Sequence, residues 1–188
     1  GDFLYPDETE TGIKIMSVNL LLDDETTPVL WRGPIIAGTV KQFYSDIIWG
    51  DIDYMFIDCP PGTGDVPLTI FQSIPIDGVV VVTTPQDLVS VIVGKAVHMA
   101  DSMNIPVIGM IENMSYFICP DCNNKHYIFG KSQLEQVIRD LYIGHAIRLP
   151  INPSLAGLMD RGEIEHIEAN ADLQEFADLI STFDPDKY

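Results

Sequence analysis

The chain has 188 residues, of which 46% are hydrophobic, and its 28 acidic and 10 basic side chains give a formal net charge of −18. This length and composition suffice to bury one good hydrophobic core, which predicts a single domain over residues 1–188. The strong negative charge repels nucleic-acid phosphates and anionic lipid headgroups, so we expect neither nucleic acid nor a membrane as a partner.

The amino-terminal stretch GDFLYPDETE lacks the basic start and the apolar segment of a secretion signal. The apolar runs are far shorter than the roughly 20 residues that span a bilayer. Three cysteines, an odd number, indicate reduced thiols and not a disulfide framework. We therefore expect a cytoplasmic protein. The first residue is Gly1 and not Met, which suggests a processed or excerpted piece.

Short apolar runs alternate with helix-length amphipathic stretches along the chain. Strands are predicted at 13–20, 54–58, 78–83, 107–111 and 143–149, and helices at 34–49, 65–74, 87–103, 132–141 and 171–182. The runs are largely apolar throughout, as in strands that helices cover on both faces. The alternation predicts an α/β fold with a doubly wound, mainly parallel β-sheet and helices on both of its faces.

The stretch IDCPPGTGD at 57–65 ends a predicted strand in a loop of two prolines and two glycines. Ligands of open parallel sheets bind at the carboxyl ends of the strands. The carboxylate of Asp58 suits Mg²⁺ coordination, and the backbone N–H groups of Gly62 to Gly64 suit a γ-phosphate or the water that attacks it. A plain strand-to-helix turn explains the same residues equally well. On either interpretation, Asp65 is expected to cap the next helix.

The stretch SYFICPDCNNKHYIFG at 115–130 lies outside the alternation and is predicted to be a small insertion that carries a CxxC motif. The spacing of Cys119 and Cys122 lets a tight turn direct both thiolates at one metal ion or cluster. The remaining ligands must then come from elsewhere in the chain, from His126 with one more group, or from a second copy. A redox dithiol and unremarkable thiols are the alternatives. Cys59 is expected to be a small buried hydrophobic residue.

Gly130, Lys131 and Ser132 reproduce the last letters of a P-loop, but Lys125 stands where that motif needs a glycine. Ser132 and Glu135 are instead predicted to form a capping box at the start of a helix. The 188 residues contain no P-loop motif.

Three stretches are distinctive in combination, namely DYMFIDCPPGTGD at 53–65, VVVTTPQDLVS at 80–90 and VIGMIENMSYFICPDCNNKHYIFG at 107–130. WRGP at 31–34 and LPINPSLA at 149–156 extend the same pattern. Together they resemble the Mrp/ApbC family of iron–sulfur cluster carrier P-loop ATPases, which are relatives of MinD, ParA and the nitrogenase iron protein. The resemblance covers nearly the whole chain from about Gly12 onward.

The resemblance implies a nucleotide site for ATP and Mg²⁺. Asp58 stands where a Walker B-type acid helps to hold Mg²⁺, and the loop with Gly62 belongs to the switch segment that senses the γ-phosphate. Asn113 matches a position that contacts adenine, and the segment with Pro150 and Asn152 matches the one that closes over the base.

The resemblance also implies a role for the two cysteines. Cys119 and Cys122 match the pair that, in a homodimer, supplies two thiolates from each subunit to a bridging 4Fe-4S cluster. The implied function is ATP-dependent transfer of that cluster to apo iron–sulfur proteins, with scaffold proteins as further partners. The alternatives are a non-catalytic module that binds Zn²⁺, a degenerate nucleotide-binding module, or a positioning ATPase of the MinD and ParA type.

One departure from the family is large. Its members begin with a deviant Walker A loop of the form GKGGVGK followed by Ser or Thr, and this loop is absent here. Without that lysine a phosphate lacks its main countercharge, so ATP hydrolysis is expected only of a longer protein. The chain is then either a fragment of an ATPase or a degenerate member. Because Asp58, Asp65 and Asn113 are retained, we favour the fragment.

Overall fold

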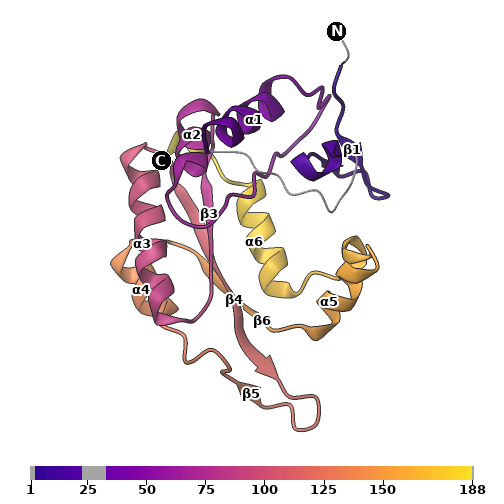
Figure 1. Cartoon of the computed structure of the whole chain (residues 1–188). Coiled ribbons are helices and arrows are strands. Elements are labelled where there is room, and N and C mark those ends of the chain that lie inside the picture. The colour runs from indigo at the N-terminus through magenta and orange to yellow at the C-terminus, as the bar shows by residue number, and fades with distance from the viewer. Residues whose placement is uncertain (1–2, 23–32, 188) are drawn as a thin grey trace. The chain divides into compact units, whose positions relative to one another are not determined.

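The structure of the chain is a computed structural model that describes residues 3–22 and 33–187. Its internal contacts divide the chain into two compact units, Gly1–Pro75 and Ile76–Tyr188, which we call the first and the second unit. Each unit is described by itself, and the prediction of a single domain over the whole chain stays a prediction. Figure 1 labels the helices and strands of both units.

The first unit contains two short strands and two α-helices. Strands β1 (Asp7–Glu8) and β2 (Lys14–Ile15) pair antiparallel, and helices α1 (Gly33–Ser45) and α2 (Asp65–Ser73) pack against each other. The strand predicted at 13–20 is formed only at β2. The side chain of Ser17 accepts a hydrogen bond from the N–H of Asn19 and starts the 3-10 helix η1 (Val18–Leu21). This local alternative to strand pairing ends the extended segment early.

The strand predicted at 54–58 is not formed. Residues 54–60 have no regular secondary structure, and the side chains of Tyr54 and Phe56 are exposed. A strand needs a neighbouring strand to pair its backbone N–H and C=O groups. Among residues 3–22 and 33–187, no strand pairs with this segment. The apolar run at 54–58 predicted a strand, but without a neighbouring strand to pair with, the segment stays irregular.

The second unit is built on three parallel strands. Strand β4 (Val107–Ile118) lies between β3 (Val79–Thr83) and β6 (Ala146–Pro150) and pairs parallel with both. Helix α3 (Asp87–Ser102) connects β3 to β4, and helix α4 (Leu134–Asp140) precedes β6. Strand β5 (Lys125–His126) pairs antiparallel with the far end of β4. This arrangement confirms the predicted α/β class with a mainly parallel sheet.

Helices cover both faces of this sheet (Figure 1). On one face, α3 and α4 form the hydrophobic core with β3 and β4 through Val81, Val93, Val97, Met110, Leu134 and Ile143. On the other face lies α6 (Ala171–Ser181), which contacts β6 and carries the buried Phe176. The described residues contain no helix that is both long and apolar enough to cross a membrane.

Two predicted helix caps differ from the structure. Gly64 is the N-cap of α2, and Asp65 is its first helical residue, an acid in the first turn. The predicted capping box of Ser132 and Glu135 is not formed, because Gln133 is the N-cap of α4. The carboxylate of Glu135 instead accepts a hydrogen bond from Arg148 Nη2 at 3.2 Å. The carboxylate is thus paired with a side chain 13 positions away and not with the backbone of its own helix start.

One further helix follows β6. Helix α5 (Pro153–Asp160) begins with a proline, and its N-cap Asn152 accepts a hydrogen bond from the N–H of Ser154 at 3.0 Å. Asn followed by Pro is a helix-start signal, so the sequence offered a way to predict this element. The 3-10 helices η2 (Ile164–His166) and η3 (Pro185–Lys187) complete the second unit.

Gly109 lies where the sheet packs closely against Phe176 of α6. A Cβ atom at this position would lie 2.7 Å from the ring of Phe176 and 3.0 Å from the carbonyl oxygen of His145. We expect Gly109→Val to lower the free energy of unfolding by about 1–3 kcal/mol, because the buried ring and the backbone must move apart. Chemical denaturation measures this loss. The matched control is Gly94→Ala within α3, where a Cβ meets nothing within 4 Å and no destabilisation is expected.

Candidate functional site

The CxxC motif lies in the turn of a β-hairpin. Strand β4 continues past the parallel sheet, and its end pairs with β5, so that Phe117 is opposite His126 and Ile118 is opposite Lys125. The N–H of Cys119 donates to the carbonyl of Asn124 at 3.0 Å, and the N–H of Asn123 donates to the carbonyl of Cys119 at 2.9 Å. These bonds close the loop between the strands. Within the segment 115–130, residues 115–118 belong to β4 and residues 125–126 to β5, and its assignment as an insertion stays a prediction.

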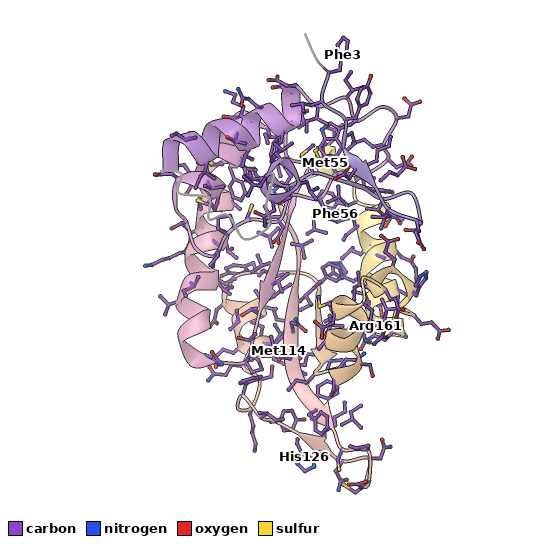
Figure 2. All side chains as sticks on the ribbon, turned by 45° about the vertical axis from the view of Figure 1, so that its right-hand side comes forward. Phe3, Met55, Phe56, Met114, His126 and Arg161 are labelled. Carbon is purple, nitrogen blue, oxygen red and sulfur yellow. The ribbon has the colours of Figure 1, made fainter. Side chains whose placement is uncertain are left out.

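Three side chains with metal-ligand atoms meet at this turn. The ligand atoms of Cys119, Cys122 and His126 all lie within 4.8 Å of one another. Cys119 is half-buried, whereas Cys122 and His126 are exposed. His126 lies near the outer end of the hairpin, away from the helices of the second unit (Figure 2). The turn can thus present two thiolates and an imidazole to an ion or to another molecule.

The two thiols at 59 and 119 have opposite pKa shifts. The pKa of Cys119 is lowered, first by a hydrogen bond from the backbone of Cys122, then by one from the backbone of Asp121, and further by the Cys122 side chain. The pKa of Cys59 is raised, first by desolvation and then by the negative charge of Asp58. The side chain of Cys59 is nevertheless exposed, so the prediction of a buried residue is wrong. Residues 54–60, which include Cys59, form no strand that a helix could cover.

These pKa shifts predict a difference in alkylation by iodoacetamide. The thiolate is the reactive form, so the rate at Cys119 should rise at lower pH than the rate at Cys59. Mass spectrometry of the modified sites over a pH series measures both rates. Asp58→Asn serves as the control, because it should move the Cys59 profile towards lower pH and leave that of Cys119 unchanged. Faster alkylation of Cys59 at neutral pH would contradict the assignment.

Asn113 lies in a bulge at the carboxyl end of the parallel part of β4. Glu112 pairs with Arg148 of β6, but the next pair is Tyr116 with Pro150, so β4 has more residues in this interval than β6. Met114 has a φ of 54°, an unusual value for a residue other than glycine, and its N–H donates to Asn113 Oδ1 at 2.9 Å. Bulges next to ligand sites redirect a side chain, which suits a residue that recognises a base.

The other two predicted base-contacting residues lie on the neighbouring strand and just after it. Pro150 ends β6 and pairs with Tyr116, so it lies at the same edge of the sheet as the Asn113 bulge. The side-chain oxygen of Asn152 is engaged as the N-cap of α5. The fold thus brings Asn113 and Pro150 to one edge, while it gives Asn152 a structural role. Contact of any of these residues with a nucleotide stays a prediction.

The sequence did not single out Glu112, the most buried charged residue of the described chain. The residue is 2% exposed. Glu112 Oε1 accepts a hydrogen bond from Ser115 Oγ at 2.5 Å, and Oε2 accepts one from Ser132 Oγ at 2.9 Å. Arg148 Nε lies 3.8 Å from Glu112 Oε1 and donates to Ser132 Oγ at 3.2 Å. An acidic residue directly before Asn113 was the available sequence signal, but two of its three partners, Ser132 and Arg148, are distant in the sequence.

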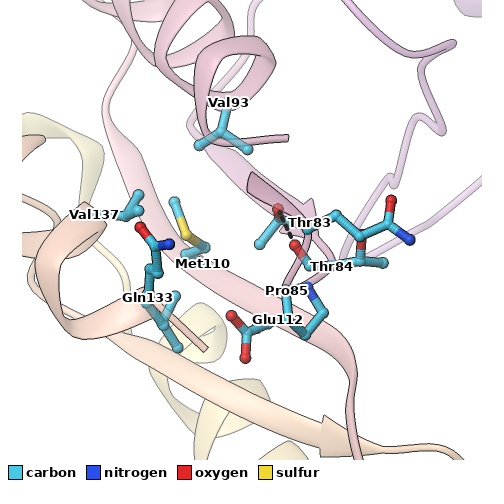
Figure 3. A pocket seen from close by; sticks show the side chains of 10 residues that line it. Thr83, Thr84, Pro85, Val93, Met110, Glu112, Gln133 and Val137 are labelled. Carbon is cyan, nitrogen blue, oxygen red and sulfur yellow. Dashed lines mark hydrogen bonds between the residues drawn. The ribbon is translucent and has the colours of Figure 1, made fainter. Parts of the chain in front are cut away.

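Glu112 also lines a small cavity at the carboxyl end of β3 and at the end of the parallel part of β4. The cavity has a volume of about 30 Å³, and its other lining residues are Thr83, Thr84, Pro85, Gln86, Val93, Met110, Gln133, Leu134 and Val137 (Figure 3). This volume holds about one water molecule and is far smaller than a nucleotide base. Its place at the carboxyl ends of parallel strands matches the usual ligand edge of such sheets.

The predicted Mg²⁺ and phosphate residues belong to the first unit. Asp58 is exposed, and Gly62 has a φ of 90°, a left-handed conformation that disfavours other residues. Gly64 caps α2 without a side chain, which leaves the first N–H groups of that helix available to an anion. The chemistry of the loop thus fits a phosphate. The roles of Asp58 and Gly62 at Mg²⁺ and a γ-phosphate stay predictions.

Comparisons with known proteins agree with these motifs. Residues 1–183 match the family model described as ParA, NUBPL iron-transfer P-loop NTPase. An iron–sulfur cluster carrier protein of Methanocaldococcus jannaschii is 48% identical over 160 residues, which cover 85% of this chain and 55% of the relative. One of Clostridium perfringens is 44% identical over 164 residues, which cover 87% of this chain and 57% of the relative.

A solved structure also resembles this fold. It is a nucleotide-binding protein of Archaeoglobus fulgidus in complex with ADP, with cobalt found by PIXE. The TM-score is 0.78 at 39% sequence identity, and the match covers 93% of this chain and 66% of that chain. The chain spans about half the length of the curated relatives that it matches. The family match extends over nearly all of the chain and confirms the resemblance seen in the motifs, so the chain belongs to the family of NUBPL iron-transfer P-loop NTPases.

Proposed function

We propose that this chain is part of an ATP-dependent iron–sulfur cluster carrier. Two copies hold a 4Fe-4S cluster between them through Cys119 and Cys122 and pass it to apo iron–sulfur proteins. The observation that carries the proposal is the exposed hairpin turn, which brings two thiols within 4.8 Å of each other in a chain whose relatives are named iron–sulfur cluster carrier proteins. We place this activity in the cytoplasm, with scaffold proteins as donors of the cluster.

The chemistry of the turn supports a shared cluster. A 4Fe-4S cluster takes about four thiolate ligands, and this turn provides two cysteines. A two-fold axis beside the turn doubles each of them and completes the set. An exposed site also leaves the cluster accessible to an apo-protein, whose own thiolates can replace those of the carrier one at a time. A carrier has to release its cluster as well as bind it, and an exposed site permits both.

The nucleotide part of the proposal rests on the family match and assigns a role to each matched residue. Asp58 helps to hold Mg²⁺, the loop with Gly62 faces the γ-phosphate, and Asn113 contacts adenine beside Pro150 and Asn152. Bound Mg²⁺ would neutralise phosphate charge. Because the chain spans only about half the length of the curated relatives that it matches, we assign ATP hydrolysis to the whole protein and not to these 188 residues.

Strand β4 connects the two proposed sites directly. It carries Asn113 and leads into Cys119 six residues later, a span of roughly 20 Å or less along a strand. A shift of the bulge on nucleotide binding therefore reaches the hairpin through continuous backbone. This route supports coupling between nucleotide state and cluster release.

Anaerobic reconstitution with ferrous iron and sulfide tests the proposal. We expect about four irons and four sulfides per two chains, together with a dimer in native mass spectrometry. A monomer that takes up no iron or sulfide would overturn it. If that monomer retained zinc, a structural zinc module would replace the carrier as the function of this turn.

A further inference from the structure

We propose that Glu112 and Ser115 form a positioning pair, which holds the side chain of Asn113 in the orientation that an adenine base requires. The inference rests on the nucleotide part of the proposed function, which assigns the base contact to Asn113 but gives no role to the buried acid before it. Neither residue of the pair needs to touch the nucleotide, because both act through the shape of the backbone between them.

The hydrogen bond within the pair exists only because β4 is bulged. In a regular strand, residues 112 and 115 would point to opposite faces, since side chains alternate and the two residues are three positions apart. In the structure both are buried, and Ser115 Oγ donates to Glu112 Oε1 at 2.5 Å. Residues 113–115 of β4 stand opposite the single residue 149 of β6. The bond therefore ties one end of the bulge to the other.

The bulge contains an unfavourable backbone conformation that needs support. Met114 has a φ of 54°, in the left-handed region that residues with a Cβ atom rarely occupy. Such conformations persist where surrounding contacts determine them, and they are frequent at binding sites. The bond between Glu112 and Ser115 spans Met114 and is a contact of this kind.

The bulge in turn fixes the amide of Asn113. The N–H of Met114 donates to Asn113 Oδ1 at 2.9 Å, so the oxygen and the NH₂ group cannot exchange places without the loss of this bond. An amide with a defined oxygen and a defined NH₂ group matches adenine, which offers a donor at N6 and an acceptor at N7. The oxygen keeps a second lone pair for the N6 donor. A flipped amide would instead set donor against donor.

Contacts from outside the bulge hold the carboxylate of Glu112 from more than one side. Glu112 Oε2 accepts a hydrogen bond from Ser132 Oγ at 2.9 Å, just before α4. Arg148 Nε of β6 lies 3.8 Å from Glu112 Oε1. Loss of one of these contacts leaves the other in place, together with the bond to Ser115. The carboxylate is thus a fixed point to which the bulge is attached.

Ser115 and Ser132 provide a matched pair of variants. Each hydroxyl donates to one oxygen of the same buried carboxylate, but only Ser115 belongs to the bulge. Ser132 Oγ also accepts hydrogen bonds from the N–H of Leu134 and from Arg148 Nε. A general loss of stability should therefore be at least as large in Ser132→Ala as in Ser115→Ala. Only Ser115→Ala should release the side chain of Asn113.

Isothermal titration calorimetry of the whole protein with ADP and Mg²⁺ tests the inference. Asn113→Ala should weaken ADP binding by about 10-fold or more, as expected for the loss of one bidentate base contact. Ser115→Ala should weaken it by about 3- to 10-fold, because only a fraction of the molecules then present the amide correctly. In the Asn113→Ala background, Ser115→Ala should have no further effect, since the pair acts only through this amide. Ser132→Ala should change the affinity by less than about 2-fold.

The outcomes distinguish the positioning role from a merely structural one. Ser115→Cys retains a weak S–H donor, so its loss of affinity should be smaller than that of Ser115→Ala, and it serves as the second variant if the alanine variant misfolds. Parent-like ADP affinity in Ser115→Ala, an equal loss in Ser132→Ala, or additive losses in the double variant would each overturn the inference. Failure of the proposed function has a different signature. A parent protein that binds no ADP refutes the nucleotide part of that proposal and this inference with it.

Discussion

We expect Cys119→Ser and Cys122→Ser each to abolish binding of the iron–sulfur cluster and to leave the fold intact. A cluster requires soft thiolate ligands, and a serine hydroxyl stays protonated at neutral pH. In a symmetric dimer each single substitution removes two of the cluster ligands, one from each copy. Iron and sulfide analysis after anaerobic reconstitution measures the loss.

The location of these cysteines explains why the fold should be unaffected. Cys122 is exposed, Cys119 is half-buried, and neither belongs to the hydrophobic core of the second unit. The free energy of unfolding should therefore change by less than about 0.5 kcal/mol. Cys59→Ser is the matched control, because Cys59 is an exposed thiol of the first unit and is expected to leave the iron content unchanged. Full iron and sulfide content in Cys119→Ser would refute the assignment of the cluster to this turn.

Glu112→Ala is expected to lower the free energy of unfolding of the second unit by about 2–3 kcal/mol. The buried carboxylate accepts hydrogen bonds from Ser115 and Ser132 and lies 3.8 Å from the guanidinium of Arg148. Its removal leaves two hydroxyl donors without their acceptor and opens a void beside the cavity at the ends of β3 and β4. Urea denaturation followed by circular dichroism measures the change.

The same arginine provides a control for this prediction. Arg148 also pairs with Glu135, whose side chain is 64% exposed, so Glu135→Gln should cost less than about 0.5 kcal/mol. Glu112→Gln retains the shape of the side chain but places an amide donor against a hydroxyl donor, and its loss should lie between the other two. Equal effects of Glu112→Ala and Glu135→Gln would show that burial of Glu112 does not govern its contribution.

The elements predicted correctly are those with a strong local pattern. The valine run at 79–83 and the helical spacing of α3 both carry their periodicity within a few residues. The strand predicted at 54–58 had the same kind of apolar run, but it has no pairing partner among the described residues. Hydrophobicity identifies a segment that can be covered, whereas strand formation also depends on residues far away in the chain.

The candidate site divides in the same way. The spacing of Cys119 and Cys122 and the position of Asn113 after the apolar run at 107–111 were readable from neighbouring residues, and with them the family. The burial of Glu112 depends on Ser132 and Arg148, which are 20 and 36 positions away along the chain. No local pattern encodes such a contact.

The sequence by itself determined the α/β class, the family, and the two thiols that can bind a metal, because periodicity and ligand spacing are local properties of the chain. Only the tertiary structure decided that β4 continues into the hairpin and that His126 lies on the same face as Cys119. Strand register is set by hydrogen bonds between segments that a turn brings together, and it alone decides to which face each side chain points.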